Sequence, residues 1–304
     1  MATIRRDTAR TTLATGRSPW AAAMGRRKKT WLLILPAVVL LLVFFILPYL
    51  YLLYISVMTQ SHNAKYVTRF TLSNYSQIIG DSFIWRVIFH TLRLGAITTA
   101  IALLLSYPLA YHLSRASSVK KSILMMLILT PLLVGVVIRT YSWMILLSDT
   151  GLINQQLQAW GLQPARLMYN DLGVTLGLVH IYIPFMVLSL AGPLQTIDPD
   201  LERAARSLGA GAWQTFWRVT WPLSLPGVVS GSVLVFVLAI SSYVIPSLLG
   251  GFTVITVPLL AIRTITELFN WPLGSALTVV FFALTMVIVW LFLRLMSRVM
   301  KGAA

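Results

Sequence analysis

The sequence predicts an all-α integral membrane protein with six transmembrane helices. Of its 304 residues, 58% are hydrophobic and only 11% are charged, and the mean hydropathy is +0.81. Because a soluble domain carries about a quarter charged residues, this composition indicates a membrane protein. Six apolar stretches are each long enough to cross the roughly 30 Å of bilayer hydrocarbon, and polar segments separate them.

The first 56 residues divide into two parts of opposite character. Residues 1–30 are polar, basic and rich in Ala, Thr and Arg, so we expect a disordered cytoplasmic tail. Residues 31–56 are apolar and long enough for the first transmembrane helix. A cleaved signal peptide is the alternative, but the basic region is too long and the apolar block exceeds the core of such a peptide.

Five further spans follow. They are expected at about residues 85–113, 122–147, 172–194, 227–249 and 273–296. Residues 57–84 are expected outside the membrane, as are residues 148–170 with a short surface helix. Spans four and five contain the small-residue pairs Gly173/Gly177 and Gly227/Gly231, whose spacing lets helices approach closely. The apolar part of the segment after span five, residues 254–262, is expected to dip back into the bundle.

The distribution of charge predicts the orientation. The chain has 24 Lys and Arg against 8 Asp and Glu, a net charge of +16. Most of the basic residues lie in segments that six spans place on one side of the membrane, which is the positive-inside pattern. We therefore expect both termini, including residues 299–304, in the cytoplasm. Nucleic acid is not an expected partner, because the orientation of the spans in the membrane already accounts for the excess of positive charge.

The segment 198–226 between spans four and five predicts two short amphipathic helices. Asp198 and Pro199 indicate a helix start, and apolar residues follow at helical spacing. Gly209 interrupts the pattern, and we expect it to adopt a positive φ. A second helix carries Trp213, Phe216, Trp217 and Trp221 on one face and is expected to end at Pro222 and Pro226. Such a pair between membrane spans predicts a docking surface.

This loop resembles that of importer permeases of the ATP-binding-cassette (ABC) superfamily. Their loop reads E-A-A, three residues, Gly, nine residues, I-x-L-P. Here the pattern falls on Arg203-Ala204-Ala205, Gly209 and Val219-Thr220-Trp221-Pro222, with Glu202 one residue before the usual Glu position. The resemblance implies a type I importer permease (MetI-like) fold with a five-helix core at residues 85–298. The implied ATPase-coupling residues are Glu202, Arg203, Ala204, Ala205, Gly209, Trp213, Phe216, Trp217 and Pro222. An ordinary interfacial helix pair is the alternative.

Four other stretches are similar to the spermidine/putrescine type of binding-protein-dependent permeases. They are residues 138–143, 151–154, 244–251 and 271–276. The resemblance implies import of a polyamine or a related amine-containing compound, and the same grouping includes importers of opines and aminoalkylphosphonates. Polyamine members often carry acids in the segments matching residues 242–248 and 269–272, whereas this chain has Ser, Tyr, Asn and Trp there.

Two basic residues, Arg93 and Arg139, fall inside predicted spans. Each costs at least about 2.5 kcal/mol there unless it finds a partner or water. They either face a pathway or pair with an acid at the outer ends, and Asp149, Asp171 and Glu267 are the candidates. The pathway candidates are Arg93, Arg139, Tyr141, Trp143, Tyr243, Glu267 and Trp271.

The sequence does not predict an enzyme. It has no G-x-x-x-x-G-K-[ST] or H-E-x-x-H motif, and the four histidines are scattered, with His180 expected to be a hydrogen-bonding group in the bundle. We expect no cofactor or metal in this chain, and ATP and Mg²⁺ in a partner. The resemblance implies an ATPase dimer, a second permease subunit, expected to be a different chain, and a periplasmic substrate-binding protein. An ion-coupled secondary transporter is the alternative class, but no acid lies near the middle of a span.

Overall fold

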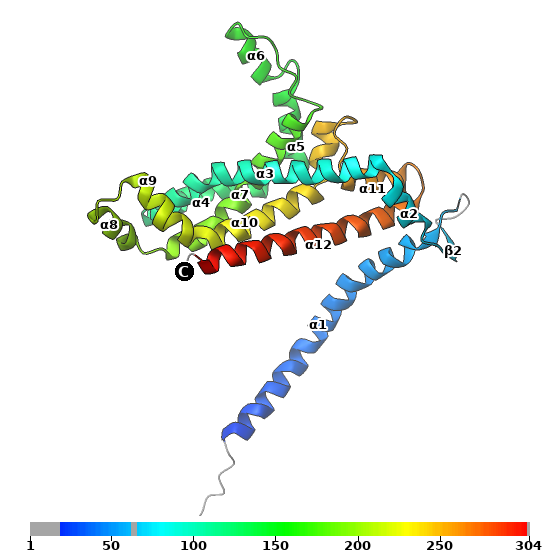
Figure 1. Ribbon diagram of the computed structural model, residues 1–304, viewed down its shortest axis with the longest axis horizontal. Helices are drawn as coiled ribbons and strands as arrows, with labels where there is room; N and C mark the ends of the chain where they lie inside the picture. The colour runs from blue at the N-terminus through cyan, green and yellow to red at the C-terminus, as the bar shows by residue number, and fades with distance from the viewer. Residues whose placement is uncertain (1–18, 62–65, 303–304) are drawn as a thin grey trace, which may run out of the picture. The chain divides into compact units, whose positions relative to one another are not determined.

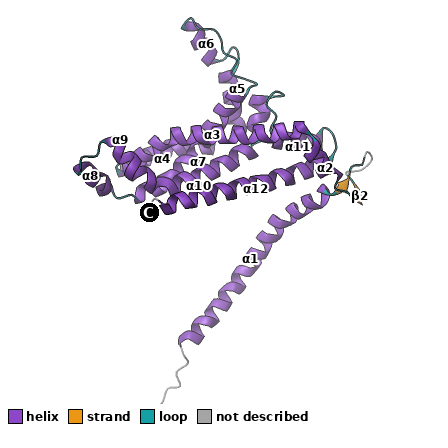
Figure 2. Ribbon diagram, in the orientation of Figure 1, coloured by secondary structure: helices purple, strands orange, loops and turns teal. Residues whose placement is uncertain are grey.

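The computed structural model describes residues 19–61 and 66–302, which are almost entirely helical (Figures 1 and 2). The chain divides into two compact units, residues 1–51 and 52–304. Helix α1 (Pro19–Ser56) makes up the described part of the first unit. Residues 19–30, expected to be disordered, are therefore helical, because an Ala-rich segment extends the helix of the first span at little cost. Residues 1–18 lie outside the described residues.

The second unit begins with a small antiparallel pair, β1 (Met58–Thr59) and β2 (Val67–Phe70), and is otherwise helical. Its helices are α2 (Ser73–Gly80), α3 (Ser82–Arg115), α4 (Ser118–Leu133), α5 (Val136–Leu147), α6 (Leu152–Ala159), α7 (Asp171–Thr196), α8 (Pro199–Ser207), α9 (Ala212–Thr215), η1 (Phe216–Thr220), α10 (Trp221–Ser241), η2 (Pro246–Gly250), α11 (Val257–Thr266) and α12 (Trp271–Gly302). Elements η1 and η2 are single turns of π-helix.

Six candidate spans occur in the described residues, in agreement with the predicted number. They are Leu35–Ser56, Ser82–Arg115, Val136–Ala159, Asp171–Thr196, Ala212–Ser241 and Trp271–Met300. Helices α3, α7 and α10 run side by side and form the main core (Figure 1). Gly231 of α10 makes this approach possible, because a Cβ there would lie 2.7 Å from the Met186 sulfur and 3.0 Å from the Ser189 Cβ of α7.

A second core cluster joins α3 to α11 and α12. It includes Ile88 of α3, Val257 and Ala261 of α11, and Leu277 of α12, all buried. Helix α11 packs along α12 and supplies the apolar dip that the sequence predicts for residues 254–262. Val257, Leu259, Ala261 and Thr264 of this helix are buried.

The third span differs from the prediction. Residues 122–147 form two helices rather than one, and the candidate span here runs through α5 and α6. Pro131 lies in the last turn of α4, where it has no N–H to continue the ladder. The Val134 N–H turns back to the Pro131 carbonyl at 3.2 Å, and Gly135 is extended. The prediction of one continuous helix is therefore wrong. Helix α6 is the short helix expected within residues 148–170.

Candidate functional site

The first half of the candidate coupling loop is helix α8, and the sequence determines both of its ends. The Asp198 side chain accepts a hydrogen bond from the Asp200 N–H at 2.9 Å, and Pro199 occupies the first turn. Gly209 has φ +89°, as predicted. The Gly209 and Ala210 N–H groups donate to the carbonyls of Arg206 and Ala205, which closes the helix with a Schellman motif.

Glu202 is the buried residue of α8, and it ties this helix to the membrane bundle. Its Oε1 accepts hydrogen bonds from Arg115 Nη2 at 2.8 Å and from Thr220 Oγ1 at 3.1 Å. Its Oε2 accepts a bond from the Tyr111 hydroxyl at 2.9 Å. Arg115 also donates to the Ile197 carbonyl at 2.9 Å. One carboxylate therefore joins α8 to the end of α3 and to η1.

The surroundings of Glu202 favour its charged form. Burial by itself raises the pKa of this carboxyl group. The hydrogen bonds from Arg115, Tyr111 and Thr220 and the positive charge of Arg115 outweigh burial and hold the pKa below its ordinary value. The carboxylate is therefore ionised at neutral pH and forms an ion pair whose two members are both largely buried.

The second half of the loop runs directly into span five. Helix α9, η1 and α10 follow one another without a break from Ala212 to Ser241, so Pro222 and Pro226 do not end a separate helix as predicted. The reason is the π-turn. The Trp221 N–H bonds to the Phe216 carbonyl, five residues back, and this local change of register accommodates a proline that lacks an N–H.

An aromatic cluster covers this junction. Phe216 and Trp221 pack on the buried Tyr107 ring of α3, with centroids 5.4 Å away in both cases. The Tyr107 hydroxyl and Ser224 Oγ are 2.7 Å apart. Trp213 and Trp217 belong to the same cluster but are 74% and 45% exposed. The inner rings fix the loop to α3, and the outer rings leave apolar surface for a partner.

The remaining predicted coupling residues are on the surface of α8. Ala204 is exposed and Ala205 is half-buried. Arg203, which occupies the usual Glu position, is also exposed and forms an ion pair with Asp200 at 2.9 Å. An exposed pair of this kind contributes about 0–1 kcal/mol. The acid one residue earlier, Glu202, is the one that contacts the bundle.

The pathway candidates fall into separate neighbourhoods rather than one cluster. Arg93 of α3 pairs with Asp171, the first residue of α7, at 2.5 Å, and His90 bonds to the same carboxylate at 2.8 Å. Arg93 therefore pairs with an acid at the end of a span, which is one of the two interpretations that the sequence allowed for this residue. Glu267 lies 3.9 Å from Arg263 of α11. Tyr141 and Tyr243 are partly exposed, and Trp271 begins α12.

Arg139 occupies the second neighbourhood, between α5 and α7. One turn along α5, Trp143 Nε1 donates to His180 Nδ1 at 3.0 Å, so His180 is the hydrogen-bonding group that the sequence predicts. The Nε and Nη1 atoms of Arg139 are buried and have no hydrogen-bond partner among the described residues. A guanidinium group in this state is a candidate ligand-binding group.

Sequence reasoning named Asp171 as a possible partner of Arg93, but it missed His90, which shares that carboxylate, and the residues that hold Glu202. Tyr111 and Arg115 are spaced i, i+4 at the end of a span, which places both on one helix face. This spacing in a chain with 8 acids is a signal that an acid pairs with them, but it does not say which acid. His90 and Arg93 are similarly spaced i, i+3.

The chain matches the family described as binding-protein-dependent transport system inner membrane component over residues 101–301. It is 31% identical over 256 residues to the spermidine/putrescine transport system permease protein PotB of Haemophilus influenzae, with 83% of this chain and 89% of that protein covered. It is 32% identical over 269 residues to the corresponding PotB protein of Escherichia coli, with 85% and 95% covered.

Two crystal structures of a bacterial alginate ABC transporter share the fold. One, in complex with an alginate pentasaccharide-bound periplasmic protein, has a TM-score of 0.77 at 17% identity and covers 93% of this chain and 98% of that chain. The other has a TM-score of 0.71 at 16% identity, with 92% and 99% covered. These likenesses confirm the all-α, MetI-like permease fold. The chain therefore belongs to the family of binding-protein-dependent transport system inner membrane components, as a transmembrane permease subunit of an ABC importer and not an enzyme.

Proposed function

We propose that the 198–226 loop couples this subunit to an ATPase. The observation that carries the proposal is the combination of exposed apolar rings with a buried anchor. Trp213 and Trp217 offer apolar surface outside the bundle, and Glu202 connects the same loop to α3 and η1. Force applied to the exposed rings is thereby transmitted to the helices of the bundle. Closure of a partner on the loop would move these elements as one body.

The partners follow from this role. An ATPase dimer binds ATP and Mg²⁺ and docks on the loop, and a periplasmic substrate-binding protein delivers the solute to the opposite face. A second permease subunit, a different chain, completes the pathway. This arrangement places both termini and the loop in the cytoplasm of a bacterium, with the chain in the inner membrane. The positive-inside charge pattern supports this orientation.

A matched pair of tryptophans tests the docking surface. Trp213 is 74% exposed and Trp160, beyond the far end of α6, is 73% exposed. We expect Trp213→Ala to remove most of the ATPase that co-purifies with the complex after gentle solubilisation, whereas Trp160→Ala leaves it unchanged. Exposed apolar anchors of this size typically contribute at least 2 kcal/mol, about thirtyfold in affinity. Equal ATPase retention in both variants would refute docking at this loop.

The substrate that the similarity supports best is a polyamine or a related amine-containing compound. The PotB relatives are named for spermidine and putrescine transport, and the likeness covers more than four fifths of this chain. The partly exposed Tyr141 and Tyr243 are aromatic faces of the kind that attract ammonium groups. The test is uptake of labelled putrescine and spermidine by reconstituted complex with its binding protein. Absence of saturable uptake of both would exclude polyamines.

Arg139 supports a second substrate class. The buried Nε and Nη1 atoms of Arg139 have no hydrogen-bond partner among the described residues, and its positive charge attracts anions and repels a bare polycation. An opine or an aminoalkylphosphonate carries an acidic group beside its amine. If such a compound is the substrate, it competes with the uptake of labelled putrescine and spermidine. Arg139→Gln should then raise the concentration of the compound that transport requires, without changing basal ATP hydrolysis. Uptake that is indifferent to Arg139→Gln would remove this candidate.

A further inference from the structure

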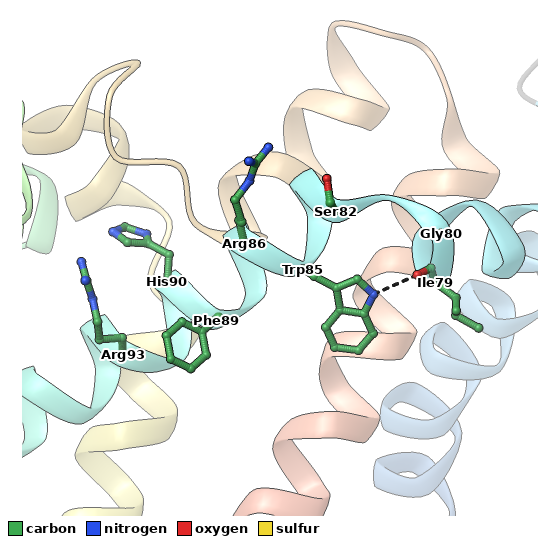
Figure 3. A pocket seen from close by; sticks show the side chains of 8 residues that line it. All are labelled: Ile79, Gly80, Ser82, Trp85, Arg86, Phe89, His90 and Arg93. Carbon is green, nitrogen blue, oxygen red and sulfur yellow. Dashed lines mark hydrogen bonds between the residues drawn. The ribbon is translucent and has the colours of Figure 1, made fainter.

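The Ser82 end of α3 carries an open pocket of about 630 Å³ (Figure 3). Ile79 and Gly80 lie at one end of this pocket and His90 and Arg93 at the other, with Trp85, Arg86 and Phe89 between them. Trp85 donates from Nε1 to the Ile79 carbonyl at 3.1 Å, which fixes its ring across the junction of α2 and α3. We call this feature the cationic pocket.

The cationic pocket contains a positive charge that the described residues do not neutralise. Arg93 and His90 share the carboxylate of Asp171. Arg86 is exposed and has no ion pair or hydrogen bond with any described residue. Trp85 and Phe89 line the same pocket, project to the other side of α3 from Arg86 in Figure 3, and are 43% and 70% exposed. Aromatic rings next to a basic side chain near the end of a span are typical of the level of lipid headgroups.

A second hollow lies further along the same helix. It is a groove of about 340 Å³ between α3, α10 and α12, and we call it the apolar groove. Its α3 wall begins at Ala96, one turn after Arg93, and ends at Leu103, about 10 Å further along the axis. The other walls include Val233 and Phe292, and most of the lining side chains are apolar.

We propose that these two hollows together bind one anionic phospholipid. The phosphate of the headgroup lies against Arg86 in the cationic pocket, and an acyl chain runs down the apolar groove past Ala100. The two hollows follow the order of the parts of a phospholipid. The charged pocket with its aromatic rings is at the end of the span, where a headgroup lies, and the apolar groove is toward the middle of the span, where an acyl chain lies. A free phosphate would satisfy Arg86 but leave the groove empty, and a neutral lipid would fill the groove but leave Arg86 without a counter-charge.

The charge is tested by native mass spectrometry of the detergent-purified complex with equimolar phosphatidylglycerol and phosphatidylcholine. We expect the wild-type chain to retain phosphatidylglycerol selectively. Arg86→Gln should lower that retention about fivefold, the factor that one basic side chain near an anionic membrane surface contributes. Arg69→Gln is the matched control, because Arg69 is also an exposed arginine. It lies on β2, which pairs with β1, and Asn74 of α2 donates a hydrogen bond to the Met58 carbonyl of β1.

The groove is tested by a change that leaves charge unaltered. Ala100→Phe fills the apolar groove and should reduce phosphatidylglycerol retention at least as much as Arg86→Gln. Leu104→Phe, on an exposed position of the same helix outside the groove, should leave retention unchanged. Inorganic phosphate at millimolar concentration should not displace the lipid, because it occupies the pocket alone.

Four results would overturn the proposal. Equal loss of lipid in Arg86→Gln and Arg69→Gln would show general electrostatic attraction. Displacement by inorganic phosphate, or no effect of Ala100→Phe, would reduce the site to a headgroup site. A photo-crosslinking residue in place of Phe89 that captures a polypeptide instead of lipid would show that protein covers the pocket. None of these results bears on ATPase docking, so the proposed function stands or fails separately.

Discussion

At the scale of single residues, the attachment of the 198–226 loop to the bundle depends on the hydrogen bonds of one acid, Glu202. Glu202 sits in a helix that is otherwise largely exposed, yet its side chain is only 9% exposed and receives three side-chain hydrogen bonds. Breaking one member of a buried pair leaves the other charge uncompensated, which costs about 3–5 kcal/mol. Glu202 therefore holds the loop in place, and the exposed residues around it remain free to contact a partner.

Replacement of Glu202 should loosen α8 without unfolding the spans. In Glu202→Gln, Arg115 loses its counter-charge, and about 3 kcal/mol corresponds to roughly hundredfold faster amide hydrogen exchange in α8. Asp200→Asn is the control in the same helix, because Asp200 is exposed and its pair with Arg203 contributes at most about 1 kcal/mol. Unchanged exchange in Glu202→Gln would show that the ion pair does not hold α8.

The lowered pKa of Glu202 predicts a dependence of stability on pH. Because the folded pKa lies below the ordinary value of 4.5, the ion pair contributes its full stability above that value. This contribution is lost as the pH falls below it and through the folded pKa. Thermal unfolding in detergent should show the wild type keeping its advantage over Glu202→Gln at neutral pH and losing it progressively as the pH falls below 4.5. A constant difference across this range would contradict the assignment.

At the scale of elements, glycines determine how the helices end and how closely they pack. Gly209 closes α8 at a positive φ, and Gly231 lets α10 lie against α7. The two positions act differently, since the first needs a backbone conformation and the second needs space. Substitutions can therefore separate a fault in the loop from a fault in the bundle.

A side chain at Gly209 should impair coupling but not membrane insertion. The positive φ makes Gly209→Ala cost about 1–2 kcal/mol, although the added Cβ meets nothing within 4 Å. Gly211→Ala is the control, because Gly211 has φ −69° and equally open surroundings. We expect Gly209→Ala to reach the membrane at a normal level and lose transport. Normal transport in this variant would mean that the geometry of the turn is not required.

A large side chain at Gly231 should destabilise the bundle itself. The Cβ alone would contact Met186 and Ser189, and overpacking of this kind costs about 1–3 kcal/mol. Gly192→Leu is the control on α7, where a Cβ meets nothing within 4 Å. The thermal unfolding midpoint of Gly231→Leu should fall, while that of Gly192→Leu should not. Equal midpoints would show that α7 and α10 tolerate a wider separation.

At the scale of the whole molecule, the six spans and the charge pattern lead to one orientation. The orientation proposed above would put the 198–226 loop and the α3–α4 connection on one side of the membrane and the end of α6 on the other. Arg115 and Glu202 support the first part, because their ion pair joins the end of α3 to α8.

Single-cysteine labelling tests this orientation without background, because the chain has no cysteine. Gln158, Ser118 and Gln214 are all exposed on the protein surface. In intact cells with a permeabilised outer membrane, an impermeant thiol reagent should label a cysteine at Gln158 and should not label one at Ser118 or Gln214. Labelling of a cysteine at Ser118 from the periplasmic side would contradict the proposed topology.

The sequence could predict the elements whose signals are local. Apolar length predicted six spans, and Asp198-Pro199 and Gly209 predicted the ends of α8. The prediction failed at prolines, because a proline ends a helix in one place and lies within a continuous helix in another. Pro131 helps to end α4, but Pro222 and Pro226 lie within a continuous helical run, because a neighbouring π-turn absorbs the change of register. A proline's effect depends on how its neighbours can rearrange, which the local pattern does not encode.

The sequence by itself determined the class of the protein, the number of its spans and the loop that marks its family, because these depend on composition, length and short-range spacing. Only the tertiary structure decided that Glu202 is buried while Arg203 is exposed and that Asp171 serves both Arg93 and His90. The same holds for Arg139, whose buried Nε and Nη1 find no hydrogen-bond partner within the described part of the chain. The physical reason is that a charge near a membrane needs a partner, and the partners of Glu202 and Arg93 lie 87 and 78 residues away in the chain. Folding brings such groups together, and no local pattern specifies which of them will meet.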